Sequence, residues 1–326
     1  MEGYISRTNR LAELLIKKDL ISNKHNAIYD YKFQTTLRDA TWSEWLDKPG
    51  YFEVADAYKE RIFEWIHENE FNTVHGLEQF KYCDLINGTT QAFDEAYFRY
   101  ANRRLRMLRG ENAYHKRVVT DYVYLDAINK DNLDMSELDY NNPIQENDWV
   151  IMSLPFAGDG NMPLGYRAIL DDCYRLKVPV LVDCAWYGTC MDIHVDLTHP
   201  AITEVAFSLT KSTGTGNIRS GVRFSNYNDN LPIRQQNNYN HLVLGAAQIG
   251  LHMMKHFPSD WQIKNYRNLQ VELCRKLNIM PSNCVHIAIA DGTENWHEQF
   301  LVDERHYKIG IRKALKALKK NQLPDV

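Results

Sequence analysis

The sequence has no long apolar run. Every hydrophobic stretch in its 326 residues is short and interrupted by polar residues, whereas a membrane-spanning helix needs about 20 consecutive, mainly apolar residues. Residues 1–15 also lack the apolar core and the cleavage site of a signal peptide. We therefore expect a cytoplasmic protein that has no membrane as a partner.

The sequence also lacks a strong excess of charge of either sign. Its 38 lysine and arginine residues stand against 42 aspartate and glutamate residues, which gives a formal net charge of -4. Nucleic acids attract strongly basic proteins, so no nucleic acid is expected as a partner. A chain of this length forms one large or two medium domains, with a core large enough for an enzyme.

No two of the six cysteines have the C-x-x-C spacing. That spacing indicates zinc sites or redox centres, and no metal is expected here. Several cysteines stand in apolar patterns typical of reduced, buried residues in a cytoplasmic protein. Cys184 and Cys190 are close in sequence to the candidate site described next, and we expect both to be packing residues.

The most informative part of the chain is a pair of short apolar runs that each lead into polar residues. Residues 178–182 (VPVLV) are followed by Asp183, and residues 205–208 (VAFS) are followed by Lys211, with Arg219 eight positions later. Ligands of an open α/β sheet bind beyond the carboxyl ends of its strands. We therefore expect these polar side chains to share one site.

Each of these groups suits one part of a single cofactor. A lysine shielded from water can have a lowered pKa and form a Schiff base with an aldehyde. Ser208, Arg219 and the Ser/Thr/Gly-rich segment around Lys211 suit a phosphate, and Asp183 suits a protonated ring nitrogen. An aldehyde, a phosphate and a pyridine nitrogen together predict pyridoxal 5'-phosphate as the cofactor.

The combined pattern resembles the signature of the fold type I, aspartate-aminotransferase-like family of pyridoxal-phosphate enzymes. That signature is Asp-x-Ala-aromatic, then Ser-x-x-Lys with an arginine eight positions after the lysine. Residues 183–186 read DCAW and residues 208–211 read SLTK. The resemblance implies that Lys211 forms the internal aldimine and shuttles the proton, that the aspartate holds the pyridinium, and that the serine and the arginine bind phosphate.

Further phosphate contacts are expected at Gly88, Thr89 and Thr90, where a short apolar strand gives way to a helix. Glycine lets the backbone approach an anion closely, and a helix N-terminus offers free N–H groups and a favourable dipole. The turn resembles the family's Gly-x-x-Glu/Gln-Ala turn, which contacts the phosphate. Taken alone, the same residues would indicate an ordinary helix cap.

The resemblance also implies contacts with the pyridine ring. Family members place an aromatic ring or a histidine where Tyr114 and His115 stand, so Tyr114 is the first candidate for stacking and His115 the second; an ordinary loop tyrosine is the alternative. Trp186 is expected beside the ring, where the family generally has a tyrosine whose phenol bonds the ring oxygen. The family's asparagine for that oxygen is missing, and Asp159 or Asn161 could substitute. Weaker bonding of this oxygen should raise the pKa of the aldimine proton.

Alternating strand and helix patterns predict an α/β fold. We expect a mainly parallel sheet with helices on both faces, and a small α+β domain built from the two termini. Residues 1–50 would form an N-terminal arm and part of the small domain, residues 51–256 the large cofactor-binding domain, and residues 257–326 the C-terminal small domain. The resemblance also implies a homodimer.

The expected function is that of an aminotransferase that exchanges an amino acid for a 2-oxo acid through an external aldimine. The family generally binds the substrate carboxylate through a small-domain arginine; Arg305 is a weak candidate, with Lys308 and Arg312 nearby, and surface solvation is the alternative for all three. Because the family's ring-oxygen contacts are missing, a lyase, cyclase or oxidase on a specialised amino acid is the second hypothesis. A non-catalytic protein that keeps the fold is the third.

Overall fold

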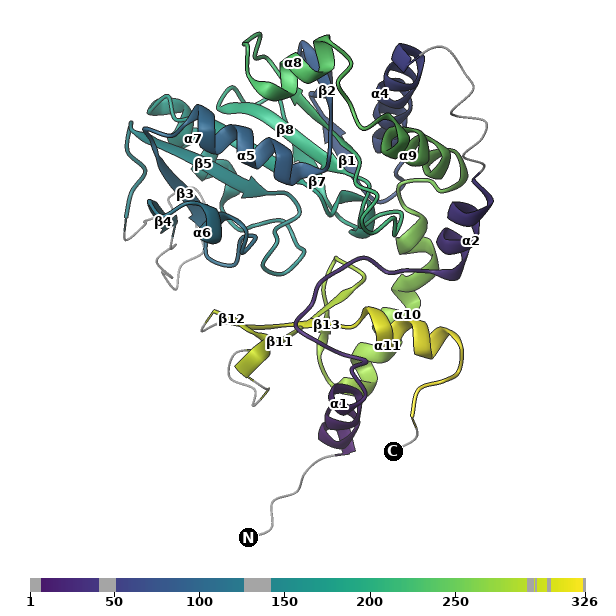
Figure 1. Ribbon diagram of the computed structural model, residues 1–326. Coiled ribbons are helices and arrows are strands. Elements are labelled where there is room, and N and C mark those ends of the chain that lie inside the picture. The colour runs from purple at the N-terminus through teal and green to yellow at the C-terminus, as the bar shows by residue number, and fades with distance from the viewer. Residues whose placement is uncertain are drawn as a thin grey trace.

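The computed structural model describes residues 7–40, 51–125, 142–291, 296, 298–303 and 306–324. They form a large sheet and a smaller sheet, each covered by helices (Figure 1). This arrangement confirms the expected α/β fold class. A short parallel pair, β1 (Thr73–His75) with β7 (His194–Asp196), lies outside both sheets.

The large sheet has seven strands. In spatial order they are β2 (Tyr82–Ile86), β9 (Gly221–Ser225), β8 (Ile202–Ser208), β6 (Val180–Cys184), β5 (Asp148–Ser153), β3 (Arg104–Leu108) and β4 (Tyr122–Leu125). Strand β9 is antiparallel to both of its neighbours, and the other neighbouring pairs are parallel. The carboxyl ends of β5, β6 and β8 therefore meet at one edge of the sheet.

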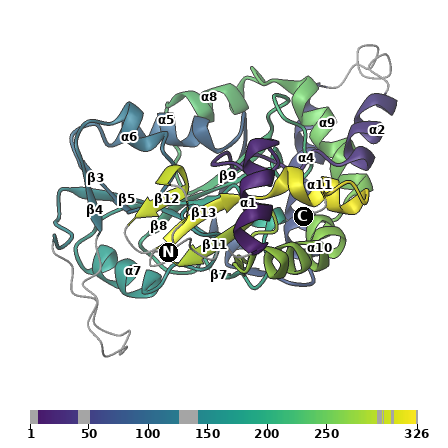
Figure 2. The same cartoon turned by 90° about the horizontal axis from the view of Figure 1, so that it is seen from below.

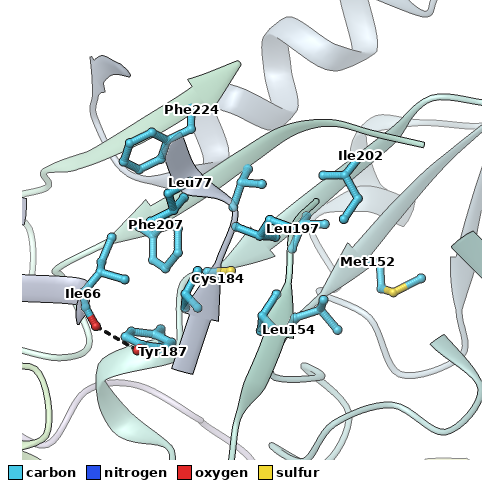
Figure 3. Close-up of a cluster of buried hydrophobic side chains, with 14 of the residues drawn as sticks. Ile66, Leu77, Met152, Leu154, Cys184, Tyr187, Leu197, Ile202, Phe207 and Phe224 are labelled. Atoms are coloured by element: carbon cyan, nitrogen blue, oxygen red, sulfur yellow. Dashed lines mark hydrogen bonds between the residues drawn. The ribbon is translucent and has the colours of Figure 1, made fainter. Parts of the chain in front are cut away.

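Helices cover both faces of this sheet. The elements are α4 (Tyr51–His67), η1 (Leu77–Gln79), α5 (Thr89–Arg99), α6 (His115–Val118), α7 (Tyr166–Arg175), η2 (Tyr187–Thr189), α8 (Pro232–Asn238) and α9 (Leu244–His256). Val150 and Met152 of β5 belong to the core that contains α4, α7 and α9, part of which Figure 3 shows. Trp149 and Ile151 belong to the opposite core, which contains α5 and α8. Since successive strand side chains point to opposite faces, β5 is buried throughout.

The small domain combines both ends of the described chain. Its sheet has the order β10 (Met280–Pro281), β11 (Ile287–Asp291), β13 (His306–Gly310) and β12 (Leu301–Asp303), with η3 (Glu298–Phe300) before the last of these. Its helices are α1 (Arg7–Lys17), α10 (Trp261–Leu277) and α11 (Arg312–Lys319). Both α1 and α11 contact α10 (Figure 2). Leu11 and Leu15 of α1, one helical turn apart, and Leu315 of α11 pack into one core with α10. Helix α2 (Tyr31–Asp39) instead packs on α9 through Phe33.

Candidate active site

Asp183 and Lys211 lie at the ends of neighbouring strands. Asp183 is near the end of β6 and pairs with Ala206 of β8, and β8 ends at Ser208, shortly before Lys211. The two side chains are close enough for each charge to shift the pKa of the other group. The structure thus brings together the acid and the amine that the sequence predicted.

The surroundings of this pair change the pKa of both groups. Burial raises the pKa of the Asp183 carboxyl to about 6, although the Lys211 charge and hydrogen bonds from Ala185 and Thr89 oppose the change. The backbone N of Ala185 lies 3.0 Å from Asp183 Oδ1. Burial lowers the pKa of the Lys211 amine, and the Asp183 charge opposes that shift. A partly desolvated amine beside a carboxylate is suited to nucleophilic and proton-transfer chemistry.

A second group of residues, here called the phosphate cup, consists of Gly88, Thr89, Thr90, Ser208 and Arg219. Arg219 donates from Nη2 to Thr90 Oγ1 at 2.9 Å and from Nε to the carbonyl before Gly88 at 3.1 Å. Gly88 has a φ of +80°, and a Cβ there would lie 2.8 Å from Arg219 Nη2. Glycine is therefore required for the guanidinium to lie against this turn.

Two further features complete the cup. Helix α5 begins at Thr89, so the N–H groups of its first turn have no partner within the helix and can bind an anion. Ser208 ends β8 opposite Gly221 of β9, and its hydroxyl lies 3.5 Å from the carbonyl oxygen of Ser220, the residue after Arg219. Helix N–H groups, hydroxyls and a guanidinium fit a phosphate. With Asp183 for the ring nitrogen and Lys211 for the aldehyde, the donor set fits pyridoxal phosphate.

The indole ring of Trp186 lies near two lysines. Lys211 Nζ is 5.4 Å and Lys308 Nζ is 5.8 Å from the centre of the indole ring. His286 packs edge-on against the same ring, with centroids 5.2 Å apart. Trp186 therefore lies near Lys211, and the small domain adds a second amine there; its contact with a cofactor ring stays a prediction.

The sequence analysis named Lys308 only as a cation near Arg305, with surface solvation as its alternative role. The structure instead places its side chain in the candidate site. Its Nζ donates to the carbonyl of Ala157 in the large domain at 2.8 Å. Burial lowers the pKa of this amine to about 8. Alternation along β13 was the available signal, because Tyr307 and Ile309 point into the small-domain core and Lys308 therefore points the other way.

Glu111 is another acid that the sequence analysis did not select. It is buried and accepts hydrogen bonds from the backbone N of Ser153, at 2.9 Å, and from the Ser153 hydroxyl. Ser153 pairs with Asp183 across β5 and β6. Burial raises the pKa of Glu111 to about 7, and the charge of Asp183 adds to this shift.

The two candidates for ring stacking differ in their surroundings. Tyr114 precedes α6, and its Oη donates to Asp94 Oδ1 at 2.7 Å. This bond and burial raise the pKa of Tyr114, and the charge of Arg219 opposes the shift. Stacking of Tyr114 on a cofactor ring stays a prediction. His115 is instead fully buried, bonded to Tyr97 Oη and packed against Phe93 in the core.

The proposed substitutes for the missing asparagine have other partners. Asp159 Oδ1 accepts a hydrogen bond from the backbone N of Asn161 at 2.9 Å. Asn161 Oδ1 accepts one from the backbone N of Asn283 at 3.1 Å, which ties the loop to the small domain. The charge of Asp159 still reaches Lys308 and opposes the lowering of its pKa.

The candidates for carboxylate binding are divided by the structure. Arg305, the weak candidate from the sequence, lies outside the described residues. Arg312 is not a solvated surface residue, because its Nη1 donates to the carbonyl of Ala27 at 3.2 Å and its guanidinium lies 5.7 Å from the Tyr29 ring centre. Among the described residues, Lys308 is a small-domain cation that lies near Lys211.

No protein-family model matches the chain, and no curated protein is similar to it in sequence. Solved structures match it over nearly its whole length. An aromatic aminotransferase from Pyrococcus horikoshii OT3 has a TM-score of 0.61 and 12% identity, with 97% of this chain and 100% of that chain covered. A pyridoxal-phosphate-bound C-S lyase from Staphylococcus hominis has a TM-score of 0.59 and 12% identity, with 91% and 88% covered. L-threonine-O-3-phosphate decarboxylase from Porphyromonas gingivalis has a TM-score of 0.57 and 12% identity, with 92% and 98% covered.

These matches define the class of fold. The chain has the fold of the fold type I pyridoxal-phosphate enzymes, as the sequence motifs predicted. The matched proteins catalyse different reactions, so the likeness does not select one of them. Across the described residues, no helix combines the length and apolar character needed to cross a membrane.

Proposed function

We propose that the protein is a pyridoxal-phosphate-dependent enzyme that acts on an amino acid, and that transamination is the leading candidate for its reaction. The observation that supports this proposal is the placement of Lys211 beside Asp183 and of Arg219 on the Gly88–Thr90 turn. When bound, the cofactor supplies an electron sink that weakens the bonds at the substrate Cα.

The residues of the chain then have separate tasks. The phosphate cup holds the anionic end and fixes the orientation of the ring. Asp183, with a pKa that burial raises to about 6, is mainly ionised at neutral pH, and a protonated ring nitrogen next to it would bring this pKa back down. Lys211, whose pKa burial lowers, would hold the aldehyde of the cofactor and would take a proton from the substrate Cα.

A lyase is the second candidate, and the placement of Lys308 supports it. An elimination needs an acid for the leaving group in addition to the base at Cα. The two amines near the Trp186 ring could divide these tasks between Lys211 and Lys308. An aminotransferase can instead use the Lys308 cation to hold the substrate carboxylate.

Covalent trapping tests the cofactor assignment. Protein incubated with pyridoxal phosphate should turn yellow, and borohydride should fix the label on Lys211, as peptide mapping would detect. Lys211→Ala should remain colourless, whereas Lys255→Ala, which changes an exposed lysine on α9, should behave like the wild type. A label on Lys308 in place of Lys211 contradicts the assignment.

A panel of amino acids then separates the two reactions. A single spectral change that a 2-oxo acid reverses indicates an aminotransferase. Sustained release of ammonia or hydrogen peroxide without a 2-oxo acid indicates a lyase or an oxidase. The homodimer stays a prediction, which light scattering of the purified protein would test.

A further inference from the structure

Two cysteines face each other where the large domain meets the small one. Cys190 directly follows η2 in the segment after the Asp183 strand, and Cys284 lies between β10 and β11. They form an isolated antiparallel bridge. No local sequence pattern indicates this pair, because its members are 94 positions apart.

The backbone around the pair has the spacing that a disulfide needs. Met191 N donates to the Asn283 carbonyl at 3.1 Å, and Val285 N donates to the Thr189 carbonyl at 3.0 Å. These two hydrogen bonds join the residues that flank Cys190 and Cys284, so the cysteines themselves form a non-hydrogen-bonded pair of an antiparallel ladder. The Cα atoms of such a pair are about 4.5 Å apart. This separation lies within the range of about 4.4 to 6.8 Å found across disulfides.

The side chains are arranged for thiol chemistry. Thr189 Oγ1 lies 3.7 Å from Cys190 Sγ and 3.4 Å from Cys284 Sγ, so both sulfurs share one neighbour. His286 Nδ1 lies 3.1 Å from Cys284 Sγ. Burial favours the thiol form of Cys284, but hydrogen bonds from Cys190 and His286 hold its pKa below the usual value, whereas burial raises the pKa of Cys190. Cys284 is therefore the nucleophile and Cys190 the resolving thiol.

We propose that Cys190 and Cys284 are an oxidation site that closes to a disulfide when a hydroperoxide reaches it. The Cys284 thiolate attacks one peroxide oxygen, the O–O bond breaks, and the other oxygen leaves as an alcohol or water after taking a proton. The resulting sulfenic acid is attacked by the Cys190 sulfur, the S–O bond breaks, and water leaves with the Cys190 proton. Two thiols are oxidised by two electrons in total, and one hydroperoxide is reduced.

The disulfide would act on the candidate active site in two ways. Both sulfurs are fully buried, so the contact between the domains must open for the peroxide to enter, and the bond would then fasten that contact. The negative charge on Cys284 raises the pKa of Lys211 and of Lys308, against the larger effect of burial. Oxidation removes this charge, so the pKa of both amines should fall.

Peptide mapping of the full chain tests the proposal. After hydrogen peroxide treatment and alkylation of the remaining thiols, we expect one cross-linked peptide pair that contains Cys190 and Cys284 and that dithiothreitol separates. Cys190→Ala should leave a sulfenic acid on Cys284 that dimedone traps, and Cys284→Ala should leave Cys190 unmodified. Recovery of both cysteines as alkylated thiols in the wild type, after unfolding, would overturn the proposal.

A matched pair of variants tests the role of the imidazole. His286→Asn should slow the cross-linking about tenfold, because the thiolate form is lost. Cys274→Ala, which changes another buried cysteine of the small domain, should leave the rate unchanged. An unchanged rate in His286→Asn contradicts the activation of Cys284 by His286.

A titration tests the link to the lysine. The rate at which an acylating reagent labels Lys211, followed against pH, should give a lower pKa for the oxidised protein than for the reduced one. Equal values in the two forms would show that the disulfide has no electrostatic effect on the site.

Discussion

The hydroxyl of Thr89 lies close enough to the carboxylate of Asp183 to lower its pKa. Thr89 begins α5, and Asp183 lies near the end of β6. One residue therefore joins the phosphate cup to the acid that is proposed for the ring nitrogen. The Thr89 hydroxyl also acts with Lys211 and the backbone of Ala185 to oppose the increase that burial causes in the pKa of Asp183.

Thr89→Val should weaken the binding of pyridoxal phosphate about tenfold, since a hydrogen bond to a charged group contributes about 1.5 kcal/mol or more. Without the hydroxyl, the pKa of Asp183 should rise above its present value of about 6, and less of the carboxylate is ionised at neutral pH. Absorbance titration of the apo protein gives the Kd. Thr89→Ser keeps the donor and should bind as the wild type does; equal weakening in both variants would indicate a packing effect instead.

Gly88→Ala should reduce affinity for pyridoxal phosphate about tenfold while leaving affinity for pyridoxal nearly unchanged. The new Cβ would lie 2.8 Å from Arg219 Nη2, on a backbone with a φ of +80°, so the guanidinium must move away from the phosphate. Comparing the Kd values of the two ligands isolates the phosphate contribution.

A second glycine provides the control. Gly245→Ala places a methyl group on an exposed position of α9, where alanine is the better helix former. It should bind both ligands as the wild type does. If Gly88→Ala weakens pyridoxal as strongly as pyridoxal phosphate, the turn does not act through the phosphate.

The residues that could be predicted from the sequence are those that follow directly from a strand or helix end. Asp183 and Lys211 were predicted because parallel strands end at one edge of a sheet, and Gly88 because a helix begins after it. The parallel strands themselves were visible as apolar runs, which burial on both faces produces.

The remaining site residues depend on contacts between distant segments. Lys308 reaches a carbonyl 151 positions away, and Glu111 reaches a serine 42 positions away. Local patterns indicate which side of a strand a residue occupies, but the partner depends on how segments far apart in the sequence pack together. Arg312 illustrates the same limit, since its carbonyl partner is 285 positions away in the N-terminal arm.

Lys308→Met should remove a limb near pH 8 from the pH profile of kcat/KM. Burial lowers the pKa of Lys308 to about 8, so the wild-type enzyme should lose activity as the pH rises through this value and the cation is neutralised. Lys308→Arg keeps the charge at all working pH values and should also lack the limb, with activity retained above about pH 8. An unaltered limb in both variants would assign it to another group.

Glu111→Gln should make the stability of the apo protein less dependent on pH. Burial raises the pKa of Glu111 from 4.5 in the unfolded chain to about 7 in the folded protein, so the folded state holds the proton more tightly. The resulting stabilisation is complete below pH 4.5 and is lost as the pH rises through about 7, with a size on the order of 3 kcal/mol.

Urea unfolding at about pH 5 and about pH 8 measures this effect. The wild-type midpoint should fall between the two conditions by more than that of Glu111→Gln, because an amide does not ionise. Glu64→Gln is the matched control, since the Glu64 side chain is 69% exposed on α4, and its midpoints should follow the wild type. If Glu111→Gln shows the same decrease as the wild type, the buried carboxyl is not the group that titrates, and the proton is held elsewhere in the site.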